Sequence, residues 1–298
     1  MKSVSMNRGN ALYHKLLAGV FMETLFEIIK SILFGIVEGI TEWLPISSTG
    51  HMILLEEFLS LKVSPEFWDV FLVVIQLGAI LAVVVLFWGK LWPFSLENGK
   101  LTSSKETWTM WLKILIACIP AAIVGLLFDD FLEAHLMNYI VVAIMLIIFG
   151  ILFIIVENAN KNKQHKINSL AEITYTTALL IGIFQLIAAV FPGTSRSGAT
   201  ILGALMLGVS RTVAAEFTFF LAIPVMFGAS LLKIVKFGFA FSGNEMLILL
   251  VGMISAFIVS ILSIKFLMNF VKKHDFKGFG YYRIALGLLV ILYFLFIA

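Results

Sequence analysis

The sequence predicts an all-α polytopic membrane protein, with six transmembrane helices and two re-entrant helix–loop–helix hairpins in inverted-topology repeats. Composition is the first reason: of 298 residues, 61% are hydrophobic and 13% are charged, and the mean hydropathy is +1.05. Soluble domains are about 45–50% apolar and about 25% charged. The other reasons are a set of long apolar runs and a pair of apolar segments that are interrupted alike. The runs lack the strict alternation of membrane strands, which argues against a β-barrel.

The chain divides into an extension and two repeats within a single integral membrane domain. Residues 1–22 are basic before a short apolar patch, without the full apolar core and cleavage site of a signal peptide. We interpret them as a disordered or interfacial N-terminal extension. Repeat 1 covers 23–156 and repeat 2 covers 173–298, and each is expected to hold one hairpin followed by three spans.

Six runs are long enough to cross a hydrocarbon core of ~30 Å, which takes about 20 helical residues. They are 67–88, 111–128, 138–156, 211–236, 245–270 and 281–298. The segments 24–59 and 173–209 differ, because each reads as two short helices around a break rich in Pro, Gly, Ser and Thr. We expect each to be a re-entrant hairpin with its tip at membrane depth, where protein or a watery cavity must bury the irregular backbone.

The two interrupted segments share one pattern. Gly35, Glu38, Glu42 and Pro45 recur at the same spacing as Gly182, Gln185, Ala189 and Pro192, and a hydroxyl-rich stretch follows each proline. Interrupted helices in matching places of two halves point to a binding site within the membrane.

The charges of the loops predict the orientation. The loops 89–113, 157–172 and 271–283 are basic, the last including Arg283, whereas 56–69 and 129–133 are acidic. Placing the basic loops in the cytoplasm makes all six spans alternate, so the first hairpin enters from outside and the second from inside. One conflict remains, since this arrangement puts the basic residues of 1–15 outside.

Glu38 and Glu42 form an acid pair in the first segment. They lie four residues apart and therefore share one helix face. Two carboxylates this close in a low-dielectric site cannot comfortably both ionise, so either one holds a proton or a cation sits between them. A polar lining between helices is the alternative, but acids within a membrane are usually functional.

Arg196 is the charged residue of the second break. Its planar guanidinium suits a phosphate, although a structural salt bridge to Glu38 or Glu42 would also explain it. A helix is expected to begin beside it, and exposed N–H groups at a helix N-terminus bind anions. The residues expected to contact the anion there, or to cap the helix, are Gly193, Thr194, Ser195, Ser197 and Gly198.

Ser47, Ser48, Thr49 and His51 occupy the first break. A hydroxyl beside an imidazole and a carboxylate has the makeup of an activated nucleophile. His51 is itself a second candidate nucleophile, or the acid for a leaving group. We expect the two breaks to meet and to form one site.

The segments Glu38–His51 and Phe191–Thr200 resemble the two signature motifs of the bacterial undecaprenyl-diphosphatases of the bacitracin-resistance (BacA/UppP) type. The likeness runs from about residue 22 to the C-terminus and includes Ala214–Pro224. It implies a cell-membrane hydrolase that converts undecaprenyl diphosphate to the monophosphate carrier for peptidoglycan synthesis, at a site open to the outer face. It places the acid pair on Glu38 and Glu42 and the serine, histidine and arginine on Ser48, His51 and Arg196.

The resemblance also implies a divalent cation, Mg²⁺ or Ca²⁺, with Glu38 and Glu42 as its ligands. The expected partners are a polyprenyl diphosphate lipid and membrane lipid. The net charge of +3 is too small to indicate nucleic acid. The sequence leaves the oligomeric state open, with a homodimer as the candidate assembly. The rival function is a lipid-phosphate transporter that binds its anionic headgroup with the same residues around Arg196, because broken helices in inverted repeats are typical of carriers.

Overall fold

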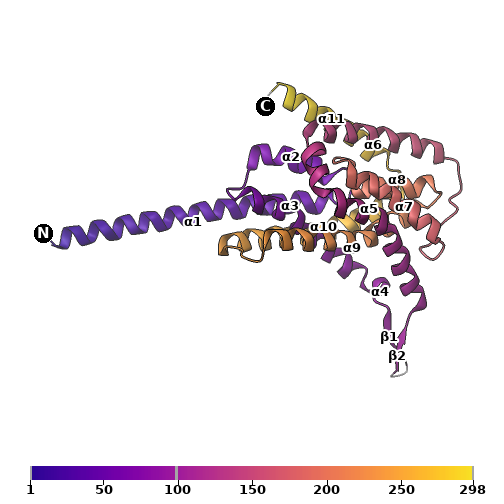
Figure 1. Ribbon diagram of the computed structural model, residues 1–298, viewed down its shortest axis with the longest axis horizontal. Helices are drawn as coiled ribbons and strands as arrows, with labels where there is room; N and C mark the ends of the chain where they lie inside the picture. Colours follow the sequence, from indigo (N-terminus) through magenta and orange to yellow (C-terminus); the bar gives the residue numbers. More distant parts are fainter. Residues whose placement is uncertain (1, 98–99, 297–298) are drawn as a thin grey trace.

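The computed structural model describes residues 2–97 and 100–296, which form a helical bundle with one small β-hairpin (Figure 1). The helices are α1 (Lys2–Thr41), α2 (Ser48–Leu59), α3 (Pro65–Leu86), α4 (Trp88–Leu91), α5 (Lys105–Leu136), α6 (Tyr139–Asn160), α7 (Tyr175–Val190), α8 (Arg196–Met206), α9 (Arg211–Phe237), α10 (Gly243–Phe270) and α11 (Lys277–Phe296). The strands are β1 (Phe94–Glu97) and β2 (Lys100–Ser103).

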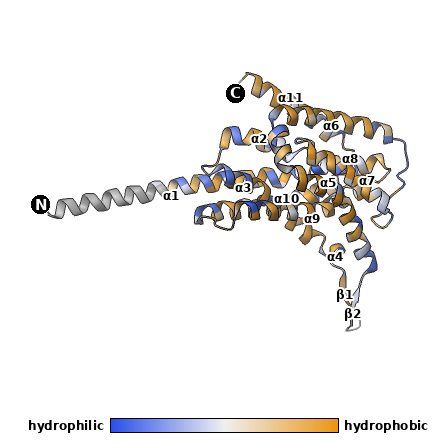
Figure 2. Ribbon diagram, viewed as in Figure 1, coloured by the Kyte–Doolittle hydropathy of each residue, from blue (hydrophilic) through white to orange (hydrophobic). Residues whose placement is uncertain are grey.

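Six helices of the described chain are long and apolar enough to cross a membrane: α3, α5 up to Phe128, α6, α9, α10 and α11. The six predicted spans are therefore confirmed by length and composition. Figure 2 shows apolar residues along these helices, and large side chains such as Leu126, Ile155 and Leu262 are exposed on them. An apolar surface of this extent is stable in lipid and not in water.

Local sequence signals explain where several helices begin. Ser64 accepts a hydrogen bond from the Phe67 N–H ahead of Pro65, which suits the first helical position. Asn138 caps α6 in the same way. Ser242 and Glu245 form a reciprocal capping box at the start of α10.

Side-chain contacts define the two ends of the bundle. At one, which we call the Phe67 end, the Phe67 ring contacts Phe237 and Phe241 at 6.3 and 6.2 Å, so α3 begins beside the α9–α10 connection. At the other, the Glu157 end, Glu157 accepts hydrogen bonds from Arg211 Nε (2.9 Å) and from the Phe276 N–H (3.0 Å). The starts of α9 and α11 therefore lie beside the end of α6.

The two interrupted segments attach to opposite ends. The Lys30 ammonium donates to the Ser60 carbonyl (2.8 Å), so α1 passes the point near the Phe67 end where α2 finishes. In the second segment, Asn160 Nδ2 donates to the Leu205 carbonyl (3.1 Å), which ties the end of α8 to the Glu157 end. Both breaks consequently point into the bundle.

Three features differ from the sequence-based expectations. No helix boundary occurs near residue 22, because α1 is continuous from Lys2 and extends beyond the other helices (Figure 1). Met1 lies outside the described residues. The region 89–113, expected to be a loop, contains α4 and the antiparallel pair β1–β2. Arg283, assigned to a basic loop, is instead buried inside α11.

Candidate active site

The two breaks have the same backbone geometry. Ser47 (φ 74°) and Ser195 (φ 68°) are the only non-glycine residues with positive φ in the described chain. Each precedes a helix and caps it, since the side-chain oxygens accept hydrogen bonds from the N–H groups of Gly50 (3.4 Å) and Gly198 (3.2 Å). Positive φ at a serine costs of order 1–3 kcal/mol, and such strain clusters at functional sites.

This geometry corrects the register that the sequence suggests. Counting from the prolines matches Arg196 with Thr49, but the caps match Ser195 with Ser47. The second break is one residue longer, because Gly193 adds a turn residue with φ 86°. Arg196 and Ser48 are therefore the equivalent first residues of α8 and α2.

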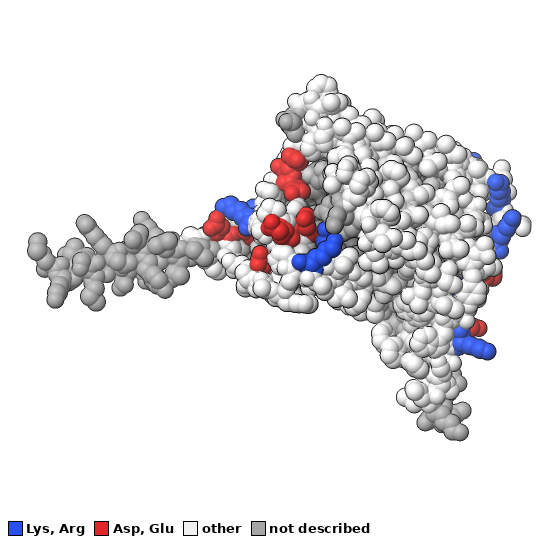
Figure 3. Space-filling view, in the orientation of Figure 1, with Lys and Arg blue, Asp and Glu red and all other residues white. Residues whose placement is uncertain are grey.

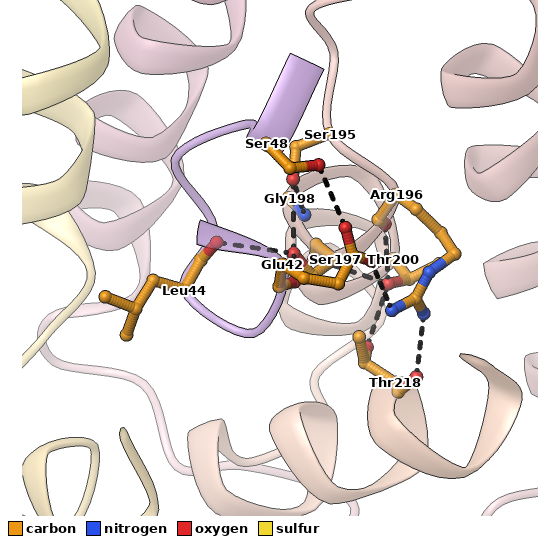
Figure 4. Close-up of polar contacts among 9 residues, drawn as sticks. All are labelled: Glu42, Leu44, Ser48, Ser195, Arg196, Ser197, Gly198, Thr200 and Thr218. Carbon is orange, nitrogen blue, oxygen red and sulfur yellow. Dashed lines mark hydrogen bonds and ion pairs between the residues drawn. The ribbon is translucent and has the colours of Figure 1, made fainter. Parts of the chain in front are cut away.

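Glu42 lies where these two helix starts converge (Figure 4). Its Oε2 accepts a hydrogen bond from Ser48 Oγ at 2.9 Å, and its Oε1 accepts one from Arg196 NH2 at 3.1 Å. The carboxyl is almost fully buried. The first break thus supplies an acid and a hydroxyl, and the second supplies the cation that pairs with the acid.

A polar network orients Arg196. Its NH1 donates to the Thr218 carbonyl (2.9 Å) on α9, and its own carbonyl accepts from Thr200 Oγ1 (2.9 Å). Thr218 Oγ1 donates to Thr200 Oγ1 (2.9 Å), which closes the network (Figure 4). The buried Nε of Arg196 has no hydrogen-bond partner. One N–H of the guanidinium is therefore free to bind an anion.

Ser197 joins the breaks through the backbone. Its Oγ donates to the carbonyl of Glu42 (3.0 Å), with Leu44 O at 3.5 Å (Figure 4). Its Oγ also lies 3.1 Å from Ser195 Oγ. This hydroxyl, predicted to bind substrate, is committed to holding α8 against the first break.

Sequence reasoning missed Arg283, which ties both breaks together from α11. Its side chain is fully buried, and its NH1 donates to the Pro45 carbonyl at 3.2 Å. Its NH2 donates to the carbonyls of Gly193 (2.9 Å) and Thr194 (2.8 Å). The available signal was its position near the start of an apolar run, where a charged residue needs a fixed partner.

His51 lies near the break but has partners of its own. Its Nδ1 lies 2.7 Å from the Ser47 carbonyl and its Nε2 lies 2.7 Å from the Tyr282 hydroxyl. A carbonyl only accepts, so Nδ1 carries a proton and Nε2 faces Tyr282. Ser48 is instead bonded to Glu42, and in the described contacts Thr49 forms no side-chain hydrogen bond with the other predicted residues.

Several buried polar atoms of the two interrupted segments have no hydrogen-bond partner. Glu38 Oε1, Thr194 Oγ1 and both amide atoms of Gln185 are buried without a hydrogen-bond partner. An unpaired buried polar group is costly, so such atoms call for water, an ion or a ligand. Gly193 also needs its backbone bare, since an added Cβ would lie 2.4 Å from the Val142 carbonyl.

The acid pair meets only part of the requirement for a metal. The Glu42 N–H donates to the Glu38 carbonyl (3.0 Å), so the two residues lie one helical turn apart and their carboxyl groups project from the same helix face. The described residues hold no group of three or more His, Cys, Asp or Glu side chains that could bind a metal ion. Two carboxylates suit Mg²⁺ or Ca²⁺ chemically, with phosphate oxygens and water completing the coordination.

Comparisons with known proteins agree on one family. The profile described as "Bacitracin resistance protein BacA" matches residues 31–289. Two relatives named undecaprenyl-diphosphatase come from Desulfitobacterium hafniense (67% identical, covering 91% of this chain and 97% of the relative) and Enterococcus faecalis (59%, 89% and 96%). Undecaprenyl-diphosphatase 1 of Clostridium acetobutylicum is 68% identical, over 90% of this chain and 98% of the relative.

Proposed function

Because this chain belongs to the bacitracin resistance protein BacA family, we propose that it is an undecaprenyl-diphosphatase of the bacterial plasma membrane. It hydrolyses undecaprenyl diphosphate to undecaprenyl phosphate and inorganic phosphate, which returns the lipid carrier to peptidoglycan synthesis and confers bacitracin resistance. The observation that carries the proposed site is the convergence of Ser48 and Arg196 on the two oxygens of Glu42.

Ser48 is the nucleophile and Glu42 is its base. The proton of Ser48 Oγ already points at Glu42 Oε2, whereas the ring nitrogens of His51 contact the Ser47 carbonyl and the Tyr282 hydroxyl and not Ser48. Ser48 Oγ bonds to the terminal phosphorus as its proton passes to Glu42. The bond from phosphorus to the bridging oxygen breaks, and undecaprenyl phosphate leaves. Glu42 gives up this proton, which His51 relays to the leaving group. Glu42 then acts again as base while water cleaves the phosphoserine, so that inorganic phosphate leaves and Ser48 regains its proton.

Arg196 and the helix starts bind the phosphates. Arg196 Nε has no hydrogen-bond partner, and the N–H groups at the beginning of α2 and α8 suit the negative charge that builds up on the phosphates. Thr49, Thr194 and the backbone beside Gly193 are the further phosphate-binding groups of this proposal. His51, paired with Tyr282, shuttles the proton for the leaving group.

Glu38 and Glu42 are the residues that would hold Mg²⁺ or Ca²⁺. Two carboxyl groups beside Arg196 would repel a diphosphate unless a proton or a cation offset their charge. The unpartnered Oε1 of Glu38 supports a cation at this position. The ion would neutralise charge on the phosphate oxygens.

The membrane arrangement follows from the two ends. Hairpin α1–α2 is re-entrant from the Phe67 end and α7–α8 from the Glu157 end, as inverted repeats. The loops of the Glu157 end are rich in lysine, and Figure 3 shows most of the visible acidic side chains, together with some basic ones, at one end of the visible face and mostly basic ones at the other. The positive-inside rule then puts the Glu157 end in the cytoplasm and opens the first hairpin to the outer face.

Replacing Arg196 tests the phosphate clamp. We expect Arg196→Ala to lower kcat/KM for undecaprenyl diphosphate by about 10²–10³-fold, on the scale of a lost oxyanion donor. Arg196→Lys should recover only part of the loss, because an ammonium lacks the planar pair of N–H donors with which a guanidinium binds phosphate. Phosphate release by purified protein measures both variants. Parental activity in Arg196→Ala, with the thermal midpoint unchanged, would refute the clamp.

Trapping the phosphorylated enzyme decides between Ser48 and His51. Acid quenching during turnover, followed by mass spectrometry, should place the phosphate on Ser48 and not on His51. Phosphorylation is also measured after alkaline quenching, where phosphohistidine survives. Phosphate that survives only the alkaline quench and is still carried by Ser48→Ala would point to His51 instead.

Transport is the competing function, and the names of the relatives support hydrolysis rather than transport. Ser48 bonded to a carboxylate also favours chemistry, since a carrier releases its substrate unchanged. Stoichiometric phosphate release in detergent, where no compartments exist, is the expected result.

A further inference from the structure

The antiparallel pair β1–β2 is an amphipathic element that no part of the proposed active site uses. Its register pairs Phe94 with Ser103 and Leu96 with Leu101. Successive side chains of a strand point to opposite faces, so Phe94, Leu96 and Leu101 share one face. Thr102 belongs to the other, where its Oγ1 lies 2.8 Å from Ser95 Oγ.

The apolar face is bare in the described chain. Leu96 is 76% exposed and Leu101 is 71% exposed. Aromatic rings border this face in a continuous row, with centroids 4.8 Å apart for Trp88–Trp92, 5.6 Å for Trp92–Phe94 and 6.0 Å for Phe94–Trp108. A two-stranded hairpin is marginally stable alone in water, so a surface that covers this face would stabilise it.

The aromatic row continues into the lipid-facing side of α5. Trp108, Leu112, Leu115 and Ile119 follow at intervals of four, three and four residues, which places them on one helix face, and each is about half exposed. α5 is one of the six candidate spans. The apolar face of the hairpin is therefore continuous with a surface that lipid covers.

The position of the hairpin matches the edge of a bilayer. β1 and β2 lie between the short helix α4, which follows the end of α3, and the first turn of α5, so they lie at the Glu157 end. In Figure 1 they extend sideways from the bundle, across the direction of the long helices. Trp residues at the end of a span are typical of the membrane–water interface, where their amphipathic rings are most stable.

We propose that β1–β2, with Trp88, Trp92 and Trp108, is an interfacial anchor that lies on the leaflet at the Glu157 end and inserts Phe94, Leu96 and Leu101 among the lipid headgroups. Such an anchor binds by buried apolar area and does not span the membrane. It fixes the depth and tilt of α5, whose lipid-facing side begins at Trp108.

Neighbouring positions on opposite faces of β2 provide the test. Leu101→Cys and Thr102→Cys are made separately in a Cys118→Ala background, labelled with an environment-sensitive fluorophore and reconstituted into phosphatidylcholine–phosphatidylglycerol nanodiscs. The probe at 101 should emit at shorter wavelength. Headgroup-nitroxide lipids should quench it several-fold more than the probe at 102, and aqueous iodide should quench the probe at 102 more. Leu96→Cys repeats the measurement from β1.

Three results would overturn the proposal. Equal quenching of both probes by iodide, with none by nitroxide lipid, would place the hairpin in water. Cross-linking between copies through residue 101, with no lipid quenching, would identify a second chain as the cover. If the probe at 101 emitted at the same wavelength as the probe at 102 in a protein that still releases phosphate, the protein would be folded and the hairpin would not be a membrane anchor.

Discussion

At the residue scale, the site depends on side chains that hold irregular backbone in place. The positive φ values of Ser47 and Ser195 need external support, and Arg283 supplies it by donating to carbonyls of both breaks. Ser197 adds a second tie, from α8 to the Glu42 carbonyl. These contacts set the distance between Ser48 and the guanidinium of Arg196, which no local sequence preference can fix.

Removing Arg283 should therefore impair stability and activity together. Arg283→Met leaves three buried carbonyls without their charged donor, and we expect the free energy of unfolding to fall by about 3–5 kcal/mol, the cost of removing one partner from a buried charged network. Arg283→Lys should restore little, because one ammonium cannot reach all three acceptors in the same geometry. Thermal unfolding in detergent and kcat for phosphate release are the measurements.

Tyr281→Phe is the matched control for this series, because Tyr281 precedes Arg283 on α11 and is 60% exposed. It should match the parental protein in both measurements. If Arg283→Met behaved like Tyr281→Phe, the tie between the breaks would have no energetic role.

At the element scale, close helix packing positions the two hairpins. Gly35 of α1 lies against the Gly252 carbonyl of α10, and Gly182 of α7 lies against the Ala117 carbonyl of α5; an added Cβ would come within 2.4 and 2.3 Å of these oxygens. Small residues let membrane helices approach closely, because van der Waals packing replaces the hydrophobic effect between helices in lipid. Each hairpin is thus fastened to a span by glycine contacts.

A glycine pair in the spans tests this packing. A Cβ at Gly78 of α3 would lie 2.1 Å from the Met253 carbonyl of α10, whereas a Cβ at Gly228 of α9 would meet nothing within 4 Å. We expect Gly78→Ala to reduce the free energy of unfolding by about 1–3 kcal/mol. Gly228→Ala should be neutral or stabilising by up to about 1 kcal/mol, as expected for glycine to alanine in a helix. Thermal unfolding followed by circular dichroism measures both, and equal midpoints would contradict the packing.

At the scale of the whole molecule, the two ends of the bundle differ in the charged residues of their connections. The Glu157 end carries lysine-rich connections, and the acidic residues Glu56, Glu57 and Glu66 lie towards the Phe67 end. The substrate headgroup must reach the junction of the breaks from one of these sides. The orientation of the bundle therefore decides which face of the cell membrane supplies the lipid diphosphate.

Cysteine labelling in intact cells tests the orientation. In a Cys118→Ala background, Phe239→Cys, in the α9–α10 connection, should react with a membrane-impermeant maleimide, because the proposed topology puts the Phe67 end outside. Lys163→Cys, in the α6–α7 connection, should react only after the membrane is opened. The reverse pattern would invert the proposed topology and close the site to the outer face.

The class of the protein follows from the sequence alone, and the site residues that it predicts include three that the structure places in contact. The six spans could be predicted because crossing a membrane depends on the average hydropathy of about 20 consecutive residues, which is a local property. Pro45 and Pro192 marked the breaks because each is followed at once by a stretch rich in glycine and hydroxyl side chains; proline alone does not end a helix here, since Pro120 and Pro224 lie inside α5 and α9. The local motifs also named Glu42, Ser48 and Arg196, which the structure brings into direct contact.

Only the tertiary structure decided which of these residues act on one another. Ser48 bonds to Glu42 rather than to His51, Arg196 corresponds to Ser48 rather than to Thr49, and Arg283 belongs to the centre of the bundle rather than to a loop. These relations join segments far apart in the chain, and they depend on the direction of each side chain after the helices pack. Because the second break is one residue longer than the first, the first residues of α8 point in a different direction from the one that counting from the prolines predicts. The hydropathy of the sequence contains no information about this direction.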